Sequence, residues 1–449
     1  MLMRVSNLIS FNRNLSKKKA PGQRFVLTSL LLIIFCMGLS INIEHDDRVL
    51  YLPKIGIPKT TTYSGYITVN ETYGANLFYL FWESQNITNK TPIIVWLNGG
   101  PGCSSLFGSF VENGPYLIDS NGTIKENPYS WNQNAHLLYV DQPVGTGYSY
   151  VKNRKGYVKS EAMMASELLS LLNGFFKLHP KYYDLDLYIF GESYAGKYIP
   201  TIAQYILEYS SINLKAIGIG DGYIDPYIQS GTFCPFLETK GLVSKVDVYE
   251  QMIMYEKYLH MSRNGNNIQA EVLGYKMLLF CSIKAGSVDV YDINYPLFED
   301  PTKGPSNALV DYLNNPEVMT AFNADHEYKS CDAIPYIYLS EDFNLSEKSL
   351  LQVLLNKGLP ILLYSGSDDL ICNHMGTELL SSTINWFGQD NFNNATTYSW
   401  YFNNDLVGSY KNSSGLTYYL IYNAGHMVPF YQPELSLTMI QTYLTNISS

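Results

Sequence analysis

Short apolar segments alternate with longer amphipathic segments along most of this chain. Residues 63–69 and 75–83 alternate apolar and polar positions on either side of a Gly-containing connection, which predicts a β-hairpin. Continuous apolar runs predict buried strands at residues 92–97, 137–140, 185–190, 215–219, 359–364 and 416–422. Helical periodicity predicts helices at residues 160–178 and 197–209. Strands that alternate with helices predict an α/β sheet with helices on both faces.

The pattern changes within residues 225–345, where helical and irregular stretches replace the apolar strands. The strand signal returns after this segment, so we interpret it as a subdomain inserted over the sheet. The predicted division is therefore an N-terminal segment at 1–43, a first part of the core at 44–224, the insertion at 225–345 and a second part of the core at 346–449.

The N-terminal segment has the pattern of a secretory signal. Its first 24 residues contain no acidic side chain and six basic ones, namely Arg4, Arg13, Lys17, Lys18, Lys19 and Arg24. An apolar run at 25–39 follows, which is typical of a signal peptide. The alternative is an uncleaved signal anchor, since apolar residues continue to Ile43. We favour cleavage, because the strongly apolar part is shorter than the ~20 residues that span a bilayer.

Charge excludes some partners. The 449 residues include 30 Lys and Arg against 40 Asp and Glu, so the formal net charge is −10. A chain this acidic is a poor candidate for binding nucleic acid or an anionic membrane surface. We expect contact with a membrane only if the N-terminal segment is an uncleaved anchor.

Cysteines and glycosylation sequons bear on the compartment. The cysteines after the N-terminal segment are Cys103, Cys234, Cys281, Cys331 and Cys372. An oxidising compartment would leave four of them paired and one free. No Cys or His spacing is typical of a metal site, and we expect no metal or other cofactor. Asn-x-Ser/Thr sequons lie at Asn70, Asn86, Asn89, Asn121, Asn344, Asn394, Asn412 and Asn446. The combination predicts a glycoprotein of the secretory pathway, either in a lysosome or vacuole or outside the cell.

Residues Gly191–Gly196 (GESYAG) join a predicted strand to a predicted helix. A serine on such a turn, between small residues, is typical of a nucleophile elbow, whose usual pattern is Gly-x-Ser-x-Gly. Ala195 takes the last position here. The same stretch fits the Gly-x-x-x-x-Gly-Lys phosphate loop, but Tyr198 replaces the Ser or Thr that binds magnesium, and Glu192 would lie among the phosphates. We therefore favour Ser193 as a nucleophile.

A nucleophilic serine needs a histidine base and a carboxylate that orients it, which follow in the order Ser, acid, His on loops after strands. His426 directly follows the last predicted strand, whereas His374 lies one helical turn beyond the preceding loop and is interpreted as structural. The loop after residues 359–364 offers Asp368 and Asp369. Spacing alone does not choose between them.

Four motifs in this order resemble the serine carboxypeptidases. They are Asn98–Ser105 (NGGPGCSS), Gly191–Gly196 (GESYAG), Asp369–Asn373 (DLICN) and Gly425–Pro429 (GHMVP). The resemblance covers about residues 61–444. It implies an α/β-hydrolase fold, with a mixed and mostly parallel sheet and an inserted lid. It also implies a serine-type carboxypeptidase that releases C-terminal residues through an acyl-enzyme.

The resemblance implies a role for each residue of the site. Ser193 would be the nucleophile, His426 the base and Asp369 the acid that orients it. Gly100 and Tyr194 would supply the backbone N–H groups of the oxyanion hole. The residues implied to bind the substrate's terminal carboxylate are Asn98, Gly99, Glu112 and Glu192, and those implied to line the substrate pocket are Cys372 and Met427. The resemblance places Glu112 opposite Glu192, and two carboxyl groups so close together would share a proton. We therefore expect better binding of peptides with a free C-terminus at acid pH.

The same resemblance implies the disulfides Cys103–Cys331 and, within the lid, Cys234–Cys281, and it leaves Cys372 free beside the active site. This sequence departs from the family at two places. Ser367 replaces the first Asp of the family's Gly-Asp-x-Asp, and the family's Gly-Asn-Gly is Gly220-Asp221-Gly222 here. We expect neither substitution to affect the chemistry.

Two alternative functions fit parts of this pattern. One keeps the catalytic residues but transfers the acyl group to an acceptor other than water. The other is a non-catalytic protein that stabilises partner enzymes. The intact set of catalytic residues favours a peptidase that acts on peptides or proteins with a free C-terminus. The sequence leaves open whether the protein forms a homodimer.

Overall fold

The structure is a computed structural model that describes residues 47–448; the predicted signal peptide or anchor at 1–43 lies outside this range. The strands are β1 (Thr62–Asn70), β2 (Ala75–Trp82), β3 (Ile93–Leu97), β4 (Tyr116–Ile118), β5 (Ile124–Glu126), β6 (His136–Asp141), β7 (Tyr150–Val151), β8 (Leu187–Glu192), β9 (Leu214–Gly220), β10 (Ile361–Gly366), β11 (Tyr398–Phe402), β12 (Asp405–Ser413) and β13 (Leu416–Ile421).

The α-helices are α3 (Glu161–Leu178), α4 (Ala195–Tyr209), α5 (Pro226–Gln229), α6 (Phe233–Thr239), α7 (Lys245–Arg263), α8 (Asn267–Lys284), α9 (Lys303–Leu313), α10 (Pro316–Ala321), α11 (Ala333–Leu339), α12 (Lys348–Asn356), α13 (His374–Thr383), α14 (Gln389–Asn394), α15 (Val428–Tyr431) and α16 (Pro433–Ser448). One turn of π-helix, η1 (Gly108–Glu112), follows β3. None of the helices described is both long and apolar enough for a bilayer span.

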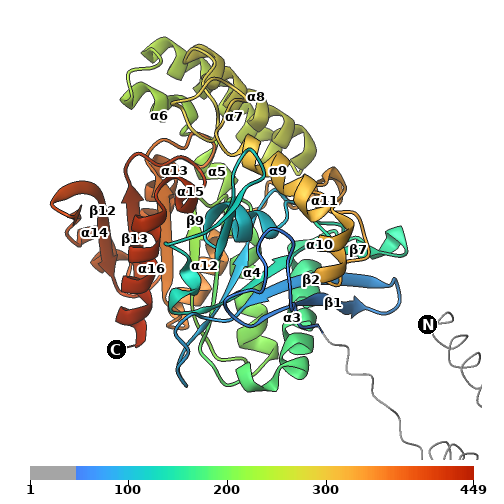
Figure 1. Cartoon of the computed structure of the whole chain (residues 1–449). Coiled ribbons are helices and arrows are strands. Elements are labelled where there is room, and N and C mark those ends of the chain that lie inside the picture. The colour runs from blue at the N-terminus through green and yellow to red at the C-terminus, as the bar shows by residue number, and fades with distance from the viewer. Residues whose placement is uncertain (1–46, 449) are drawn as a thin grey trace, which may run out of the picture. The chain divides into compact units, whose positions relative to one another are not determined.

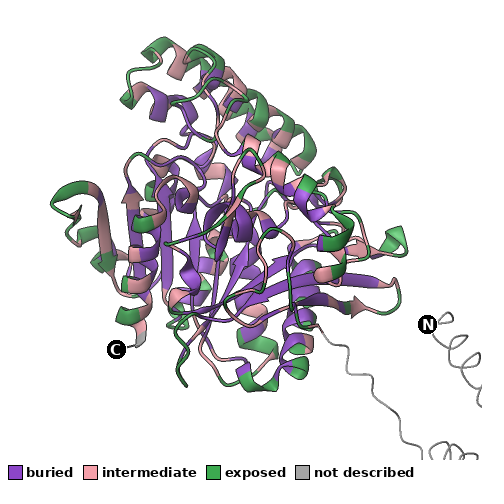
Figure 2. Cartoon of the chain, in the orientation of Figure 1, coloured by how far each residue is buried: buried purple, intermediate pink, exposed green. Residues whose placement is uncertain are grey.

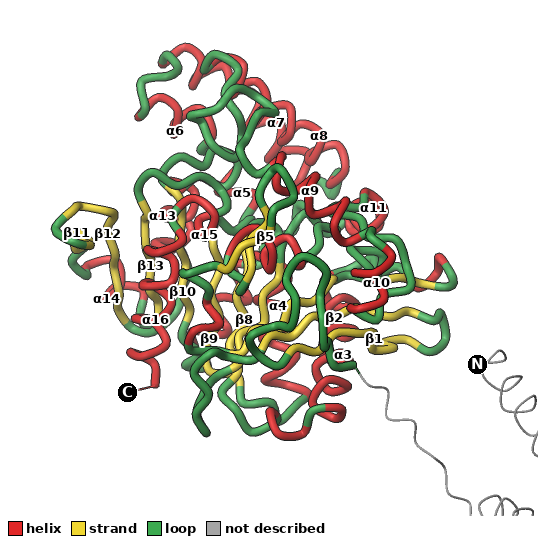
Figure 3. The backbone as a smooth tube through the Cα atoms, viewed as in Figure 1, coloured by secondary structure: helices red, strands yellow, loops and turns green. Residues whose placement is uncertain are grey.

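A mixed sheet in the order β1-β2-β6-β3-β8-β9-β10-β13-β12-β11 forms the centre of the described region (Figures 1 and 3). The strands from β6 to β13 in this order pair in parallel, and antiparallel strands flank them on both sides. This is the α/β-hydrolase type of sheet that the resemblance implied. Parallel strands end at the same edge, so the loops after β3, β8, β9, β10 and β13 can meet there.

Helices cover both faces of the sheet, which leaves the central strands almost wholly buried (Figure 2). Alternate residues of β3 point to opposite faces: Ile93 and Val95 pack with α3, α4 and α12, whereas Ile94 and Trp96 pack with α9 and α16. Burial on both faces explains why the central strands are continuous apolar runs in the sequence.

Helix α3 illustrates how sequence directs a local element. Ser160 caps its N-terminus by accepting a hydrogen bond from Met163 N–H. Its apolar side chains recur at helical spacing and enter the core on one side, where Leu168, Leu172 and Phe175 are almost completely buried. Burial of each such side chain contributes about 1.5–3 kcal/mol to folding.

One hairpin in the second part of the core, β11–β12, was not predicted. Its residues are mostly half-buried or exposed and lack a continuous apolar run that would indicate a buried strand. The segment between β9 and β10 contains only helices among its regular elements, as the change of pattern indicated. Helices α6, α7 and α8 form a small apolar core of their own beyond the sheet (Figure 1).

Two disulfides lie within residues 47–448, Cys103–Cys331 and Cys234–Cys281. The first joins the Gly-rich loop after β3 to the segment before α11. The second joins α6 to α8 inside the helical insertion. Both pairs are those that the resemblance implied, and Cys372 is free and buried.

Asn344 is an exception among the sequons, because it is buried. Its amide donates to Asn267 O at 2.6 Å and accepts from the Tyr258 hydroxyl at 2.9 Å. A glycan at Asn344 would remove these buried hydrogen bonds, so we withdraw this residue from the predicted glycosylation sites. The remaining sequon asparagines are exposed or partly exposed.

Lys197, in the first turn of α4, is completely buried. Its ammonium donates to the carbonyl oxygens of Asp342 and Leu345, each at 2.6 Å, and lies 3.9 Å from a Glu347 oxygen. The lysine thereby attaches the end of the helical insertion to the helix that follows Ser193.

Replacing Lys197 with Met should lower the free energy of unfolding by about 3–5 kcal/mol, because buried carbonyl and carboxyl groups lose their cation. Lys215 is a matched control, since its ammonium forms a half-exposed ion pair with Asp186 at 3.6 Å. Lys215→Met should cost less than about 1 kcal/mol. Denaturant unfolding measures both values, and equal losses would contradict this account of Lys197.

Candidate active site

Ser193 lies on the sharp turn between β8 and α4. Its φ of 62° is in the left-handed region, which residues with a side chain seldom adopt. Ser193 N–H donates to Gly220 O at 3.1 Å, and Ser193 O accepts from Tyr223 N–H at 2.9 Å. A Cβ at Gly191 would lie 2.2 Å from Leu97 O, so the close approach of β3 requires glycine there. The turn leaves Ser193 partly exposed between buried neighbours.

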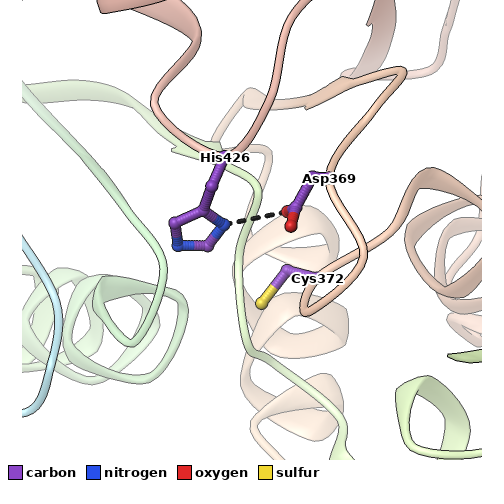
Figure 4. A group of neighbouring side chains, drawn as sticks. All are labelled: Asp369, Cys372 and His426. Atoms are coloured by element: carbon purple, nitrogen blue, oxygen red, sulfur yellow. Dashed lines mark hydrogen bonds and ion pairs between the residues drawn. The ribbon is translucent and has the colours of Figure 1, made fainter. Parts of the chain in front are cut away.

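His426 and Asp369 come from the loops after β13 and β10, which are neighbouring parallel strands. The distance from His426 Nδ1 to Asp369 Oδ2 is 2.8 Å, and both side chains are buried (Figure 4). Asp369 Oδ1 also accepts from Ile371 N–H at 3.0 Å. Because Nδ1 faces the carboxylate as donor, Nε2 is left as the proton acceptor. His426 Nε2 is buried, and no described group forms a hydrogen bond with it.

Ser193 and His426 line one pocket together with Asn98, Gly99 and Glu192. No hydrogen bond links Ser193 to His426 Nε2 in the described part of the chain. Nucleophile and base therefore face the same space without direct contact, a looser geometry that is common in hydrolases before the substrate tightens it.

Asp368, the other candidate acid, faces away from His426. One of its oxygens is 2.9 Å from the ammonium of Lys240 in the helical insertion, and the other accepts from the Asn294 amide at 3.2 Å. Ser367, which departs from the family pattern, accepts a hydrogen bond from Asn423 N–H at 3.0 Å. These two residues attach the acid loop to its surroundings, and Asp369 alone of the pair contacts the histidine.

The Gly-rich loop after β3 approaches the elbow closely. A Cβ at Gly99 would lie 2.4 Å from Tyr194 N and 2.8 Å from Ser193 Cβ, so only glycine fits. Gly100 has a φ of 111°, which also favours glycine. Both Gly100 and Tyr194 line a pocket that includes Ser193. The backbone of both residues therefore borders the same space as Ser193.

Asn98 holds Glu112 and Glu192 together. Its amide nitrogen donates to Glu112 Oε1 at 2.9 Å and to Glu192 Oε1 at 3.0 Å. The amide orientation is determined by its oxygen, which accepts from Trp96 Nε1 at 2.8 Å and from Gly108 N–H at 3.1 Å. Sequence analysis missed the role of Trp96; an indole two residues before a buried asparagine, on the same side of a strand end, was the available signal.

The carboxyl groups of the two glutamates meet at the Asn98 amide and are almost completely buried. Two ionised carboxylates so close together in a buried site would repel each other, which favours a shared proton. Burial raises the pKa of Glu112 to about 7, and burial together with the charge of Glu112 raises the pKa of Glu192 well above its ordinary value. Glu192 lines the pocket of Ser193 and His426, whereas Glu112 lies behind it in η1.

Ser193 also lines a second hollow. Its walls are largely aromatic and aliphatic, and include Tyr223, Phe233, Tyr275, Leu278, Tyr336 and Phe343. Cys372 lines this hollow, and Met427 lines the polar one that holds Glu192. Ser193 thus lines both an apolar hollow and the hollow that contains Glu192.

Comparisons with known proteins agree with this geometry. The family model for serine carboxypeptidases matches residues 53–446. Serine carboxypeptidase S10 family member 1 of Dictyostelium discoideum is 36% identical over 430 residues, which cover 94% of this chain and 100% of that protein. The chain belongs to the serine carboxypeptidase family. Its sequence-based assignment as a serine-type carboxypeptidase, a hydrolase, is confirmed.

Two further serine carboxypeptidases extend the comparison. The pheromone-processing carboxypeptidase kex1 of Aspergillus fumigatus is 36% identical over 421 residues, 86% of this chain and 66% of that protein. The crystal structure of a prohormone-processing carboxypeptidase from Saccharomyces cerevisiae, Kex1(delta)p, superposes with a TM-score of 0.77 at 26% identity, covering 86% of this chain and 92% of that one. The predicted α/β-hydrolase fold is thereby confirmed.

Cys372 lies beside the acid–base pair of this carboxypeptidase (Figure 4). Ligand atoms of Asp369, Cys372 and His426 lie within 4.8 Å of one another, close enough to hold a cation. A cation there would compete with the bond between His426 Nδ1 and Asp369 Oδ2, so we assign these atoms to the acid–base pair. Burial and the neighbouring acids raise the pKa of the Cys372 thiol well above its ordinary value.

A mercurial should therefore bind Cys372 and block most activity, because a bulky group on this sulfur would fill the hollow beside Ser193. Iodoacetamide should react slowly at neutral pH, since it requires the thiolate. Cys372→Ser is the matched control and should keep activity while losing sensitivity to mercurials. Activity measured after stoichiometric mercurial labelling tests this; full activity would contradict it.

Proposed function

We propose that this enzyme releases single residues from the free C-terminus of peptides and proteins, and that it does so best at acid pH. The observation that carries the proposal is the buried acid pair Glu112–Glu192, held by Asn98 in the wall of the pocket that contains Ser193. A protonated carboxyl group and an amide can both donate hydrogen bonds to a terminal carboxylate. Gly99, in the same wall, could add its backbone N–H.

In the proposed reaction, Ser193 Oγ attacks the scissile carbonyl while His426 Nε2 takes the hydroxyl proton. The N–H groups of Gly100 and Tyr194 stabilise the resulting oxyanion. His426 then gives the proton to the leaving amine, and an acyl-enzyme remains on Ser193. Water attacks the acyl-enzyme by the same route in reverse, and Asp369 holds the imidazole throughout.

The two hollows support an orientation for the substrate. The C-terminal residue would lie in the polar hollow, where its carboxylate meets Glu192 and Asn98. The residue before it would lie among Phe233, Leu278 and the other apolar side chains, on the opposite side of Ser193. This arrangement favours substrates with a large apolar or aromatic residue before the cut.

We also propose the compartment in which this enzyme acts. Two disulfides and the exposed sequons support an enzyme of the secretory pathway, located in a lysosome or vacuole or outside the cell. We propose cleavage of the N-terminal segment rather than anchoring. Homodimer formation stays a hypothesis, which a measurement of the molecular mass in solution would test.

Replacing Ser193, His426 or Asp369 with Ala should each reduce kcat by about 10⁴-fold or more, and double replacements should lose little beyond this, because the three act as a unit. Release of the C-terminal amino acid from a blocked Phe-containing dipeptide measures kcat. Asp368→Ala is the matched control and should have only a mild effect, since Asp368 contacts Lys240 instead of His426.

The same assay separates the alternatives. Wild-type release that a serine-directed inhibitor abolishes supports a peptidase. Release that requires an added acyl acceptor would favour an acyltransferase. No turnover with any blocked dipeptide would favour a non-catalytic role.

KM for a peptide with a free C-terminus should rise with pH. Below the raised pKa of the Glu112–Glu192 pair, the shared proton provides a donor; above it, the donor is replaced by a charge of the same sign as the substrate's. Glu112→Gln and Glu192→Gln should flatten this rise, since an amide donates at every pH. KM measured for wild type and both variants, from acid to mildly alkaline pH, tests the prediction.

A substrate with an amide in place of the terminal carboxylate is the control, because its KM should depend little on the acid pair. A wild-type KM that does not change with pH would contradict the proposed carboxylate site. So would variants whose KM keeps the pH dependence of wild type.

A further inference from the structure

Asp221, at the end of β9, lies between the elbow and the acid loop. It is completely buried, and its φ of 43° turns the chain away from the sheet. Its backbone N–H donates to Tyr364 O at 2.8 Å, and its Oδ1 accepts from Gly366 N–H at 2.9 Å. The side chain is thereby attached to the end of β10, three residues before Asp369.

The carboxyl group of Asp221 faces the carboxyl group of Asp369 at hydrogen-bonding range. A hydrogen bond between them requires a proton on one of the two groups. Asp369 already accepts from His426 Nδ1 and from Ile371 N–H. Asp221 accepts only from Gly366 N–H, and its buried Oδ2 receives no N–H or O–H donor from the described residues. The proton therefore belongs on Asp221, and Asp369 stays the acceptor.

The surroundings of Asp221 favour its neutral form. The titratable groups that face it are Asp369 and Cys372 from the loop after β10, Glu192 from β8, Tyr364 from β10 and Tyr418 from β13. All of them are acids, so none could stabilise a carboxylate at position 221. Burial, and after it the charge of Asp369, raises the pKa of Asp221 well above its ordinary value.

We propose that Asp221 is a positioning residue, whose neutral carboxyl group donates a hydrogen bond to Asp369 and thereby holds the Asp369–His426 pair in place. This inference rests on the proposed roles of Asp369 and His426. It contradicts our expectation that the Asp at position 221 leaves the chemistry untouched. When Asp221 loses its proton, the donor disappears and two carboxylates face each other in a buried site. The Asp369–His426 pair then loses its support, so turnover falls as pH rises.

This effect is separate from that of the Glu112–Glu192 pair. The glutamates act on the substrate's terminal carboxylate and therefore on KM. Asp221 acts on the groups that perform the reaction and therefore on kcat, for substrates with or without a terminal carboxylate. A blocked dipeptide amide, which lacks that carboxylate, isolates the contribution of Asp221.

The test is the pH profile of kcat for a blocked dipeptide amide. Asp221→Asn preserves the shape of the side chain, its acceptor for Gly366 N–H and the left-handed turn, and its amide donates to Asp369 at every pH. We expect the variant to keep wild-type kcat at acid pH. At alkaline pH its kcat should exceed that of wild type by about tenfold for each pH unit above the midpoint of the wild-type decline. KM should change little.

Asp368→Asn is the matched control, since it makes the same change one residue from Asp369 without a contact to the pair. It should leave the profile as in wild type. Asp221→Val removes the donor and should lower kcat at acid pH, where wild type still has it. If that variant does not fold, Asp221→Asn decides the matter alone.

A profile of Asp221→Asn that declines with wild type would overturn the proposal, and so would a loss of kcat in this variant at acid pH. A spectroscopic measurement provides a second criterion. The infrared C=O stretch of a protonated carboxyl group should be present in wild type at neutral pH and be reduced in Asp221→Asn. An intensity in the variant equal to that of wild type would also contradict the assignment, since the Glu112–Glu192 pair contributes equally to both proteins. Ser193→Ala and Asp369→Ala, assayed in parallel at acid pH, show separately whether the proposed catalytic roles hold.

Discussion

Burial of carboxyl groups at one edge of the sheet is the constraint on which the site depends. Glu112, Glu192, Asp221 and Asp369 are all almost completely shielded from water. An ionised carboxylate without compensating partners is costly in such a place, so each group must be neutral or must accept several hydrogen bonds. The structure uses both solutions. Asp369 accepts from His426 and from backbone, whereas the other three form contacts that require shared or retained protons.

The topology of the sheet brings these acidic side chains together. The loops after β3, β8, β9, β10 and β13 come from neighbouring strands of one parallel array. These segments bring polar side chains together at one edge of the sheet: Asn98, Glu192 with Ser193, Asp221, Asp369 and His426. Two backbone positions at this edge have no room for a side chain. Gly99 packs against the turn that contains Ser193, and Gly366 packs against the loop that contains His426.

The helical insertion completes the site on the side away from the sheet. It provides most of the apolar wall of the hollow beside Ser193. It is attached to the core by Cys103–Cys331, by Lys197 and by the ion pair of Lys240 with Asp368. The last contact leaves one aspartate of the acid loop facing the insertion and the other facing His426. Substrate preference and catalytic geometry thus depend on the same attachments.

The sequence by itself determined the fold class and the order of the chemical groups. Apolar runs identified the central strands, because burial on both faces excludes polar residues from them, and the turn residues identified the loops that follow. It missed the hairpin β11–β12, whose half-buried residues carry no such signal. Spacing left Asp368 and Asp369 open, the resemblance implied Asp369, and the tertiary structure places Asp369 against the histidine. The tertiary structure alone decided that Asn344 is buried and that Asp221 faces Asp369. The physical reason is that chain order determines which loops reach the edge of the sheet, while the direction of each side chain depends on segments that pack against it from more than a hundred residues away, as Lys240 does for Asp368 and Asp221 for Asp369.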